Sequence, residues 1–172
     1  MKALFYTLAA IFVVGCGSSQ VPQNTTVDPD EPSNGKVSNN TFTDGERIGE
    51  MMNYLASNDM KGREAGSEGI EMAAMYIENY FKSYGVKPYF ETYRDTLSKF
   101  KKPAYNIVGM IDGNDPNLKD EYILIGAHYD HIGTIKPENG DYIANGANDN
   151  ASGTTSVLEM ARYFGTQKTN RR

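Results

Sequence analysis

The first half of the chain carries two apolar patterns with the period of an α-helix. The first pattern recurs at intervals of three and four residues and consists of Ile48, Met51, Met52 and Leu55. Thr43 and Glu46 have the spacing of a capping box, so this helix and the folded part of the chain are predicted to begin near Thr43. A second helix is predicted to begin after the capping residue Ser67 and to end at Gly85. Its expected buried face consists of Ile70, Ala73, Ala74, Ile77, Phe81 and Tyr84.

Two apolar runs further along the chain predict strands. The first run is residues 106–111. The segment before it, residues 89–103, fits either an outer strand or a loop. Residues 122–127 are almost continuously apolar, which is typical of a strand buried on both faces of an α/β sheet. A third helix is predicted from about Ala151 to Phe164. One of its faces would consist of Thr154, Val157, Leu158 and Ala161. The order helix, helix, strand, strand, helix indicates an α/β layer architecture.

The first fifteen residues have the features of an export signal. Lys2 precedes a short apolar stretch, residues 3–14, which is too short to span a bilayer comfortably. The stretch ends just before Cys16 in a pattern that resembles a bacterial lipobox, and the alternative is an ordinary signal peptide with a chance cysteine. The lipobox interpretation predicts removal of residues 1–15 and lipidation of Cys16. The protein would then be exported and anchored by lipid to the bacterial cell envelope.

The region after the predicted signal has the composition of a tether. Residues 16–42 are rich in Pro, Asn, Ser, Asp and Gly and contain few apolar side chains that could offset the entropy lost on ordering. We therefore expect three parts: a signal peptide over residues 1–15, a disordered tether over residues 16–42 and a folded domain over residues 43–172.

Composition narrows the class of protein. The chain has 172 residues, of which 39% are apolar and 23% charged, a balance typical of globular proteins. A net charge of −5 argues against nucleic acid as the main partner, because phosphate binding needs a basic surface. A single cysteine excludes an internal disulfide framework. The two histidines, His128 and His131, lie three residues apart, so any histidine chemistry must occur at that one place.

Two polar segments follow the predicted buried strand. In the first, His128 and Asp130 would point to the same face of an extended chain. In the second, Asp149 comes just before the start of the third helix. Imidazole and carboxylate suit Zn²⁺ or a similar divalent ion, and a metal-binding imidazole commonly donates its other N–H to a carboxylate. These residues also admit plain structural interpretations. The His-x-Asp pair would serve as a local hydrogen bond, and Asp149 with its neighbouring asparagines as turn and helix-capping residues.

The two segments together resemble the signature of the co-catalytic zinc aminopeptidases, a family of exported bacterial metallopeptidases. Its pattern is Gly-Ala-His-x-Asp-His-x-Gly, followed by Asn-Gly-Ala-(Asp or Asn)-Asp-Asn-Ala-Ser-Gly, and residues 126–133 and 145–153 match nearly every position. Residues 62–67 and 105–109 also fit the opening of that family. The resemblance implies a three-layer α/β/α zinc-peptidase fold with a mixed sheet, incomplete in this chain.

The resemblance also implies roles for individual residues. His128 would bind one zinc ion and Asp149 would bridge two, while Asp130 would orient His128 without binding metal. The peptide bond after Asp149 would be cis, and His131 receives no certain role. The implied reaction is hydrolysis of peptide bonds by a water that the two zinc ions activate, with a glutamate as general base. Aminopeptidase activity is the default expectation, and carboxypeptidase and cyclase-like activities stay open.

The sequence departs from the family after the third predicted helix. The family continues with a strand and a Glu-Glu pair that supplies the general base and a zinc ligand, but this sequence contains no Glu-Glu pair and no histidine after His131. We therefore assign no catalytic residue here, expect the chain as written to be a truncated and inactive form, and expect apolar faces of the third helix to be exposed. The alternative is a membrane-anchored binding lipoprotein without catalysis that derives from the peptidase fold.

Overall fold

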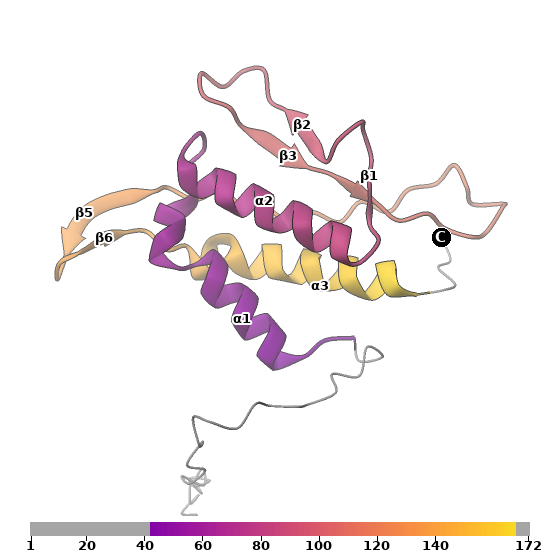
Figure 1. The fold of residues 1–172 in the computed structure, drawn as a ribbon, viewed down its shortest axis with the longest axis horizontal. Coiled ribbons are helices and arrows are strands. Elements are labelled where there is room, and N and C mark those ends of the chain that lie inside the picture. The colour runs from indigo at the N-terminus through magenta and orange to yellow at the C-terminus, as the bar shows by residue number, and fades with distance from the viewer. Residues whose placement is uncertain (1–41, 168–172) are drawn as a thin grey trace, which may run out of the picture. The chain divides into compact units, whose positions relative to one another are not determined.

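Three α-helices form the centre of the fold in a computed structural model that describes residues 42–167. They are α1 (Gly45–Leu55), α2 (Glu68–Ser83) and α3 (Ser152–Thr166), with a short helical segment, η1 (Asn58–Arg63), between α1 and α2. Both α1 and α2 contact α3, as Figure 1 shows. The three helices predicted from apolar periodicity are thus confirmed.

The helix starts show where local prediction succeeded and where it missed. Ser67 caps α2 as predicted, since its side chain accepts a hydrogen bond from the backbone N–H of Ile70 at 3.3 Å. The cap of α1 is Asp44 rather than Thr43, because the Asp44 carboxylate accepts from the N–H of Glu46 at 3.0 Å. The predicted capping box was therefore wrong by one residue, although the helix itself is present.

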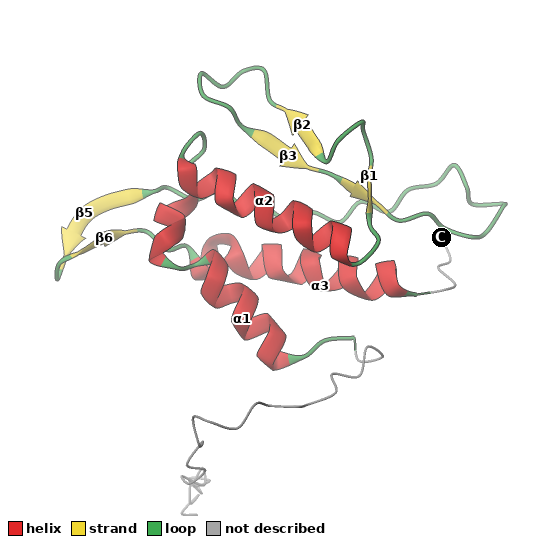
Figure 2. Cartoon of the chain, viewed as in Figure 1, coloured by secondary structure: helices red, strands yellow, loops and turns green. Residues whose placement is uncertain are grey.

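The strands of the described region are short and pair only in antiparallel ribbons. β1 (Lys87–Pro88) pairs with β4 (Gly109–Met110), and β2 (Arg94–Thr96) pairs with β3 (Tyr105–Ile107). β5 (Thr134–Glu138) and β6 (Asp141–Ile143) form a separate hairpin. Figure 2 shows this hairpin and the other two ribbons at different sides of the helices. Within residues 42–167 there is consequently an α/β arrangement, but not the mixed sheet expected for this chain.

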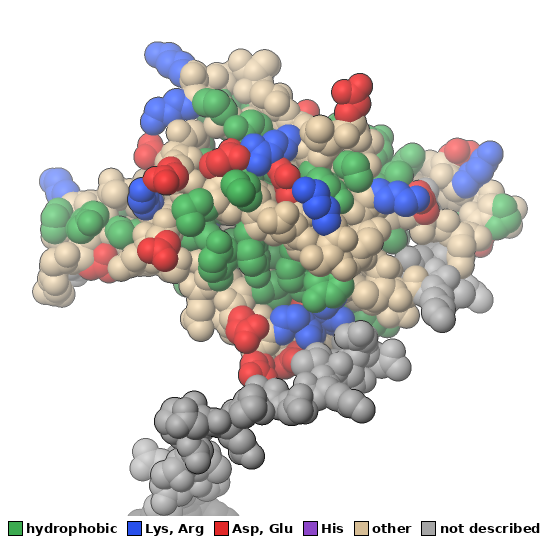
Figure 3. All heavy atoms as spheres, in the orientation of Figure 1, with side chains coloured by type: hydrophobic (Ala, Val, Ile, Leu, Met, Phe, Trp, Pro, Cys, Tyr) green, Lys and Arg blue, Asp and Glu red, His purple; other side chains and the backbone are tan. Residues whose placement is uncertain are grey.

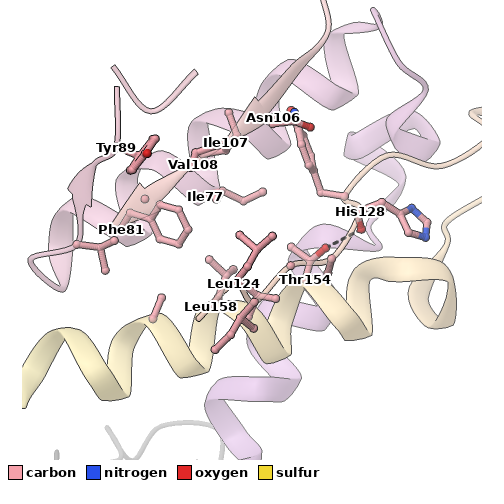
Figure 4. A pocket seen from close by; sticks show the side chains of 18 of the residues that line it. Ile77, Phe81, Tyr89, Asn106, Ile107, Val108, Leu124, His128, Thr154 and Leu158 are labelled. Atoms are coloured by element: carbon pink, nitrogen blue, oxygen red, sulfur yellow. Dashed lines mark hydrogen bonds between the residues drawn. The ribbon is translucent and has the colours of Figure 1, made fainter. Parts of the chain in front are cut away.

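The prediction of a buried strand over residues 122–127 was wrong for the described part of the chain. This segment forms no strand, and Leu124 is 93% exposed. The physical reason is that a strand depends on hydrogen bonds with neighbouring strands, and no described strand pairs with it. The apolar run instead borders a groove of about 1130 Å³ that α2 and α3 also line. In Figure 4, Leu124 and Leu158 lie on one side of this groove and Phe81 on the other.

The hydrophobic core lies where the helices meet η1 and the β2 region. Its buried members are Met51, Leu55, Met60, Ala73, Ile77, Phe81, Val86, Tyr93, Ala151 and Leu158. The predicted face of α3 is only partly in this core: Thr154 and Leu158 are buried, whereas Val157 and Ala161 are half-buried and line the open groove. The expectation that α3 exposes apolar surface is therefore confirmed. Figure 3 shows apolar side chains gathered over the helices on one face of the molecule, with charged side chains around them.

The other side of α3 packs through a buried charge. Glu159 is 3% exposed, and its carboxylate accepts two hydrogen bonds from Arg47 of α1, at 2.8 and 3.0 Å. It also accepts one from the Tyr80 hydroxyl of α2 at 3.0 Å and further hydrogen bonds from Arg162, one turn further along α3, at 3.2 to 3.4 Å. A single carboxylate thus joins all three helices.

Candidate metal centre

His128 lies at one end of the groove, just after the apolar run of residues 122–127. Its backbone carbonyl accepts a hydrogen bond from the Thr154 hydroxyl near the start of α3, at 3.1 Å, which Figure 4 marks with a dashed line. The next residue, Tyr129, donates from its hydroxyl to the carbonyl of Tyr105 on β3 at 2.8 Å, and burial raises the pKa of that phenol. Contacts to a helix and to a strand therefore hold the backbone on both sides of the imidazole.

The two nitrogens of the His128 ring face two different carboxylates. Nδ1 lies 3.3 Å from Oδ1 of Asp130, and Nε2 lies 3.1 Å from Oδ1 of Asp149. All three side chains are more than half exposed. The structure therefore brings together the three residues singled out in the sequence, although 21 positions separate His128 from Asp149.

Asp149 lies on an irregular helical turn, η2 (Ala147–Ala151), between the hairpin and α3. Gly146 precedes this turn with a left-handed φ of +60°, and a Cβ atom there would lie 2.7 Å from His131 and 2.6 Å from the carbonyl oxygen of Asp149. Only glycine fits this conformation and this space without displacement. The peptide bond between Asp149 and Asn150 is cis, as the resemblance implied.

The capping interpretation suits Asn150 but not Asp149. The Asn150 side chain accepts a hydrogen bond from the N–H of Gly153 at 3.1 Å, in the first turn of α3. The Asp149 carboxylate instead faces the two histidines, with Oδ2 3.8 Å from Nδ1 of His131. His131, which received no role from the sequence, is thus close to the predicted bridging ligand, and its side chain is only 14% exposed.

The donor set fits part of a zinc centre. An imidazole nitrogen and a carboxylate oxygen converge, and a second carboxylate occupies the position that commonly orients a metal-binding histidine. Within residues 42–167, however, no group of three or more His, Cys, Asp or Glu side chains is arranged to hold a metal ion. A catalytic zinc site needs about three protein ligands, so the described residues offer only part of the ligand set that such a site requires.

A histidine and a carboxylate that converge beside an apolar groove suit the chemistry of a metal-dependent hydrolase. Residues 106–172 match the family model described as Peptidase family M28. That family comprises co-catalytic zinc peptidases, and the match covers this part of the chain only. The matched region includes His128, Asp130 and Asp149, and the predicted family is confirmed.

One curated relative extends the comparison. The chain is 30% identical over 119 residues to the protein named "Uncharacterized protein YfbL" of Escherichia coli (strain K12). The alignment covers 69% of this chain and 34% of that protein, so the chain spans about a third of the length of the relative. No solved structure matches the chain.

The predictions about the N-terminal part of the chain concern residues that the structure does not describe. Cys16, the predicted lipidation site, and residues 1–41 lie outside the described residues. Lipid anchoring and export therefore stay predictions. Among the helices that the structure describes, none is long and apolar enough to cross a membrane.

Replacing Asp130 with Asn is expected to weaken zinc binding by roughly 10- to 100-fold, the usual effect of losing a carboxylate partner of a metal-binding histidine. The amide keeps the shape of the side chain but removes the negative charge that lies 3.3 Å from Nδ1 of His128. Competition with a zinc-binding dye measures the affinity of the purified protein. The matched control is Asp112→Asn, which removes a carboxylate paired with Lys87 at the surface. Equal affinities in both variants would show that Asp130 does not act on His128.

Proposed function

We propose that the protein is a zinc-dependent exopeptidase that hydrolyses peptide bonds, with aminopeptidase activity as the first expectation. The observation that carries this proposal is the pairing of His128 Nε2 with Asp149 and of Nδ1 with Asp130, within a segment that matches Peptidase family M28. Because the chain spans about a third of its relative, activity and substrate are proposed for the full-length protein.

Each residue of the centre has a distinct task in this proposal. His128 and Asp149 would hold the metal, through an imidazole nitrogen and a carboxylate. The carboxylate of Asp130, 3.3 Å from Nδ1 of His128, would orient the ring so that Nε2 faces the metal, and the backbone carbonyl of Asp130 lies 3.2 Å from the same Nδ1. When bound, zinc polarises the scissile carbonyl and lowers the pKa of a bound water. The printed sequence contains no Glu-Glu pair, so we assign the general base to none of its residues.

We also propose that residues 122–127 become an inner strand of a three-layer α/β/α fold in the full-length protein. The support is the apolar character of this segment and its exposure, which reaches 93% at Leu124. The half-buried Val157 and Ala161 of α3 line the same groove. Pairing with further strands would satisfy the backbone of the segment and remove this apolar surface from water.

A peptidase assay with metal removal tests the proposed function. The full-length protein should release the chromophore from amino-acid p-nitroanilides, and it should act more slowly on substrates whose α-amine is acetylated. Dialysis against a chelator should abolish the activity, and added Zn²⁺ should restore it. Full activity after chelation, or no hydrolysis of any free or blocked peptide substrate, would contradict the proposal.

A further inference from the structure

We propose that Arg63 is a positioning residue that fixes the spacing between the two segments carrying His128 and Asp149. The connection between the two segments is inferred from hydrogen bonds of the described residues. The effect of Arg63 on metal binding rests on the proposed zinc site. No local pattern in the sequence indicates such a role, because an arginine between glycine and glutamate in a polar loop is normally exposed.

The Arg63 guanidinium donates to backbone carbonyls from three separate parts of the chain. Nε donates to the carbonyl of Tyr129 at 2.9 Å, which lies between His128 and Asp130. Nη1 donates to the carbonyl of Asn145 at 2.8 Å and Nη2 to that of Gly146 at 2.8 Å. Nη1 also donates to the carbonyl of Leu55 at the end of α1. Four of the five N–H donors of arginine are therefore used, and three of them reach the backbone beside the predicted ligands.

The backbone around Arg63 reinforces the same connection. The N–H of His131 donates to the carbonyl of Arg63 at 3.0 Å, and the N–H of Gly133 donates to the carbonyl of Gly62 at 3.0 Å. Arg63 adopts a left-handed φ of +47°, which is unfavourable for a residue with a side chain and persists only where surrounding contacts require it. A Cβ atom on Gly62 would lie 2.1 Å from the carbonyl oxygen of Gly133, so the two segments approach as closely as backbones allow.

Burial explains why the Arg63 side chain needs these hydrogen bonds. Arg63 is 1% exposed, and a buried cation is costly unless hydrogen bonds and nearby charge compensate for its lost hydration. Among the described residues no carboxylate forms an ion pair with it, so the carbonyls provide its hydrogen-bond partners. Burial lowers the pKa of Arg63, and the negative charges of Asp130 and Asp149 offset part of this effect. The cation and the two site carboxylates therefore support one another.

Lysine cannot reproduce this arrangement. Its ammonium group has three donors at one point, whereas the guanidinium places five donors in a planar fork. In Arg63→Lys the charge is kept, but at least one of the carbonyls of Tyr129, Asn145 and Gly146 loses its partner. We expect the segments that bear His128 and Asp149 to open locally in this variant, even where the fold is kept.

Hydrogen exchange of the metal-free full-length protein tests the geometric part. In Arg63→Lys, exchange should be about tenfold faster at the amides of His131 and Ala151, the loss expected when a buried hydrogen bond is removed. The matched control is Arg162→Lys, which alters another buried arginine. Arg162 lies toward the end of α3 and donates to Glu159 and to the carbonyl of Phe42. The control should leave these two amides unchanged relative to the rest of the protein. Equal effects of both variants at these amides would overturn the inference, as would no effect of Arg63→Lys.

Zinc affinity tests the consequence for the site and separates the two proposals. Arg63→Lys should bind Zn²⁺ about tenfold more weakly than the unaltered protein, and Arg162→Lys should bind it equally well. Unchanged zinc affinity in Arg63→Lys would overturn the role of Arg63 in placing the ligands. If the unaltered protein bound no zinc, the proposed function would fail, and the exchange experiment would still decide whether Arg63 joins the two segments.

Discussion

Asp149→Ala in the full-length protein is expected to abolish peptidase activity, with a fall of at least roughly 1000-fold. The loss of a single donor that stabilises transition-state charge already costs up to about this factor, and Asp149 is proposed to hold the metal itself. Its carboxylate lies 3.1 Å from Nε2 of His128 and 3.8 Å from Nδ1 of His131, so the variant also removes the carboxylate that faces His131 and one of the two that face His128. Zinc content, measured by mass spectrometry of the dialysed protein, should fall together with activity.

The matched control for this variant is Asp115→Ala. Asp115 lies in the turn after β4 and accepts a hydrogen bond from the N–H of Asn117, away from both histidines. It should keep its activity and its zinc content. Retention of activity in Asp149→Ala would remove this residue from the metal centre and contradict the proposed site.

Glu159→Gln is expected to lower the free energy of unfolding by roughly 3 to 5 kcal/mol, the usual cost of breaking a buried ion pair from one side. The amide cannot neutralise Arg47 and Arg162, which both donate to the buried carboxylate. Urea denaturation at neutral pH measures the change. The control is Glu68→Gln, which removes an exposed ion pair with Lys61 and should leave the stability nearly unchanged. Equal stability of both variants would show that the Glu159 network does not stabilise the packing of the helices.

The pH dependence of stability provides a second signature of Glu159. Burial by itself would raise the pKa of Glu159, but hydrogen bonds from Arg47, Arg162 and Tyr80 outweigh it and hold the pKa below its ordinary value of 4.5. A carboxyl with a lowered pKa in the folded state stabilises the protein above the ordinary pKa, and this stabilisation is lost as the pH falls through the lower value. The difference between the unaltered protein and Glu159→Gln should therefore be largest near neutral pH and shrink below pH 4.5.

Helices could be predicted from the sequence because their signals are local. The apolar face of α2 and its Ser67 cap depend on residues three or four positions apart, and both are present in the structure. The burial of α3 was harder to predict. Its polar Glu159 and Arg162 are buried while Val157 is half-buried, because ion pairs with α1 and hydrogen bonds with α2 cover the polar side.

The strand predicted over residues 122–127 illustrates a limit of apolar patterns. Such a run indicates a segment that is stable when covered on both faces, but the pattern does not supply the neighbouring strands that cover it. In the described region the antiparallel ribbons pair among themselves, so Leu124 is left 93% exposed. The apolar pattern thus indicates that the segment is stable when covered by neighbouring strands, but it does not show whether the described residues provide them.

Some features of the candidate site could be predicted from the sequence and others could not. His128, Asp130 and Asp149 could be selected because their residue types suit metal binding and because their motifs match a family signature. Two other features could not be predicted from the sequence: the proximity of His131 to Asp149 and the burial of Arg63. Both depend on how residues 62–64, 129–133 and 144–146 meet in space. The residues next to Arg63 in the sequence do not indicate that its side chain binds distant backbone carbonyls.

Anomalous diffraction at the zinc edge, from crystals of the full-length protein grown with Zn²⁺, is the most direct test of the central claim. The account predicts an anomalous peak within bonding distance of both Nε2 of His128 and the carboxylate of Asp149, at about 2.0 to 2.2 Å from each. Asp130 should remain hydrogen-bonded to the other nitrogen of the His128 ring. Zinc bound only at other residues, or no peak beside His128 and Asp149, would contradict the account.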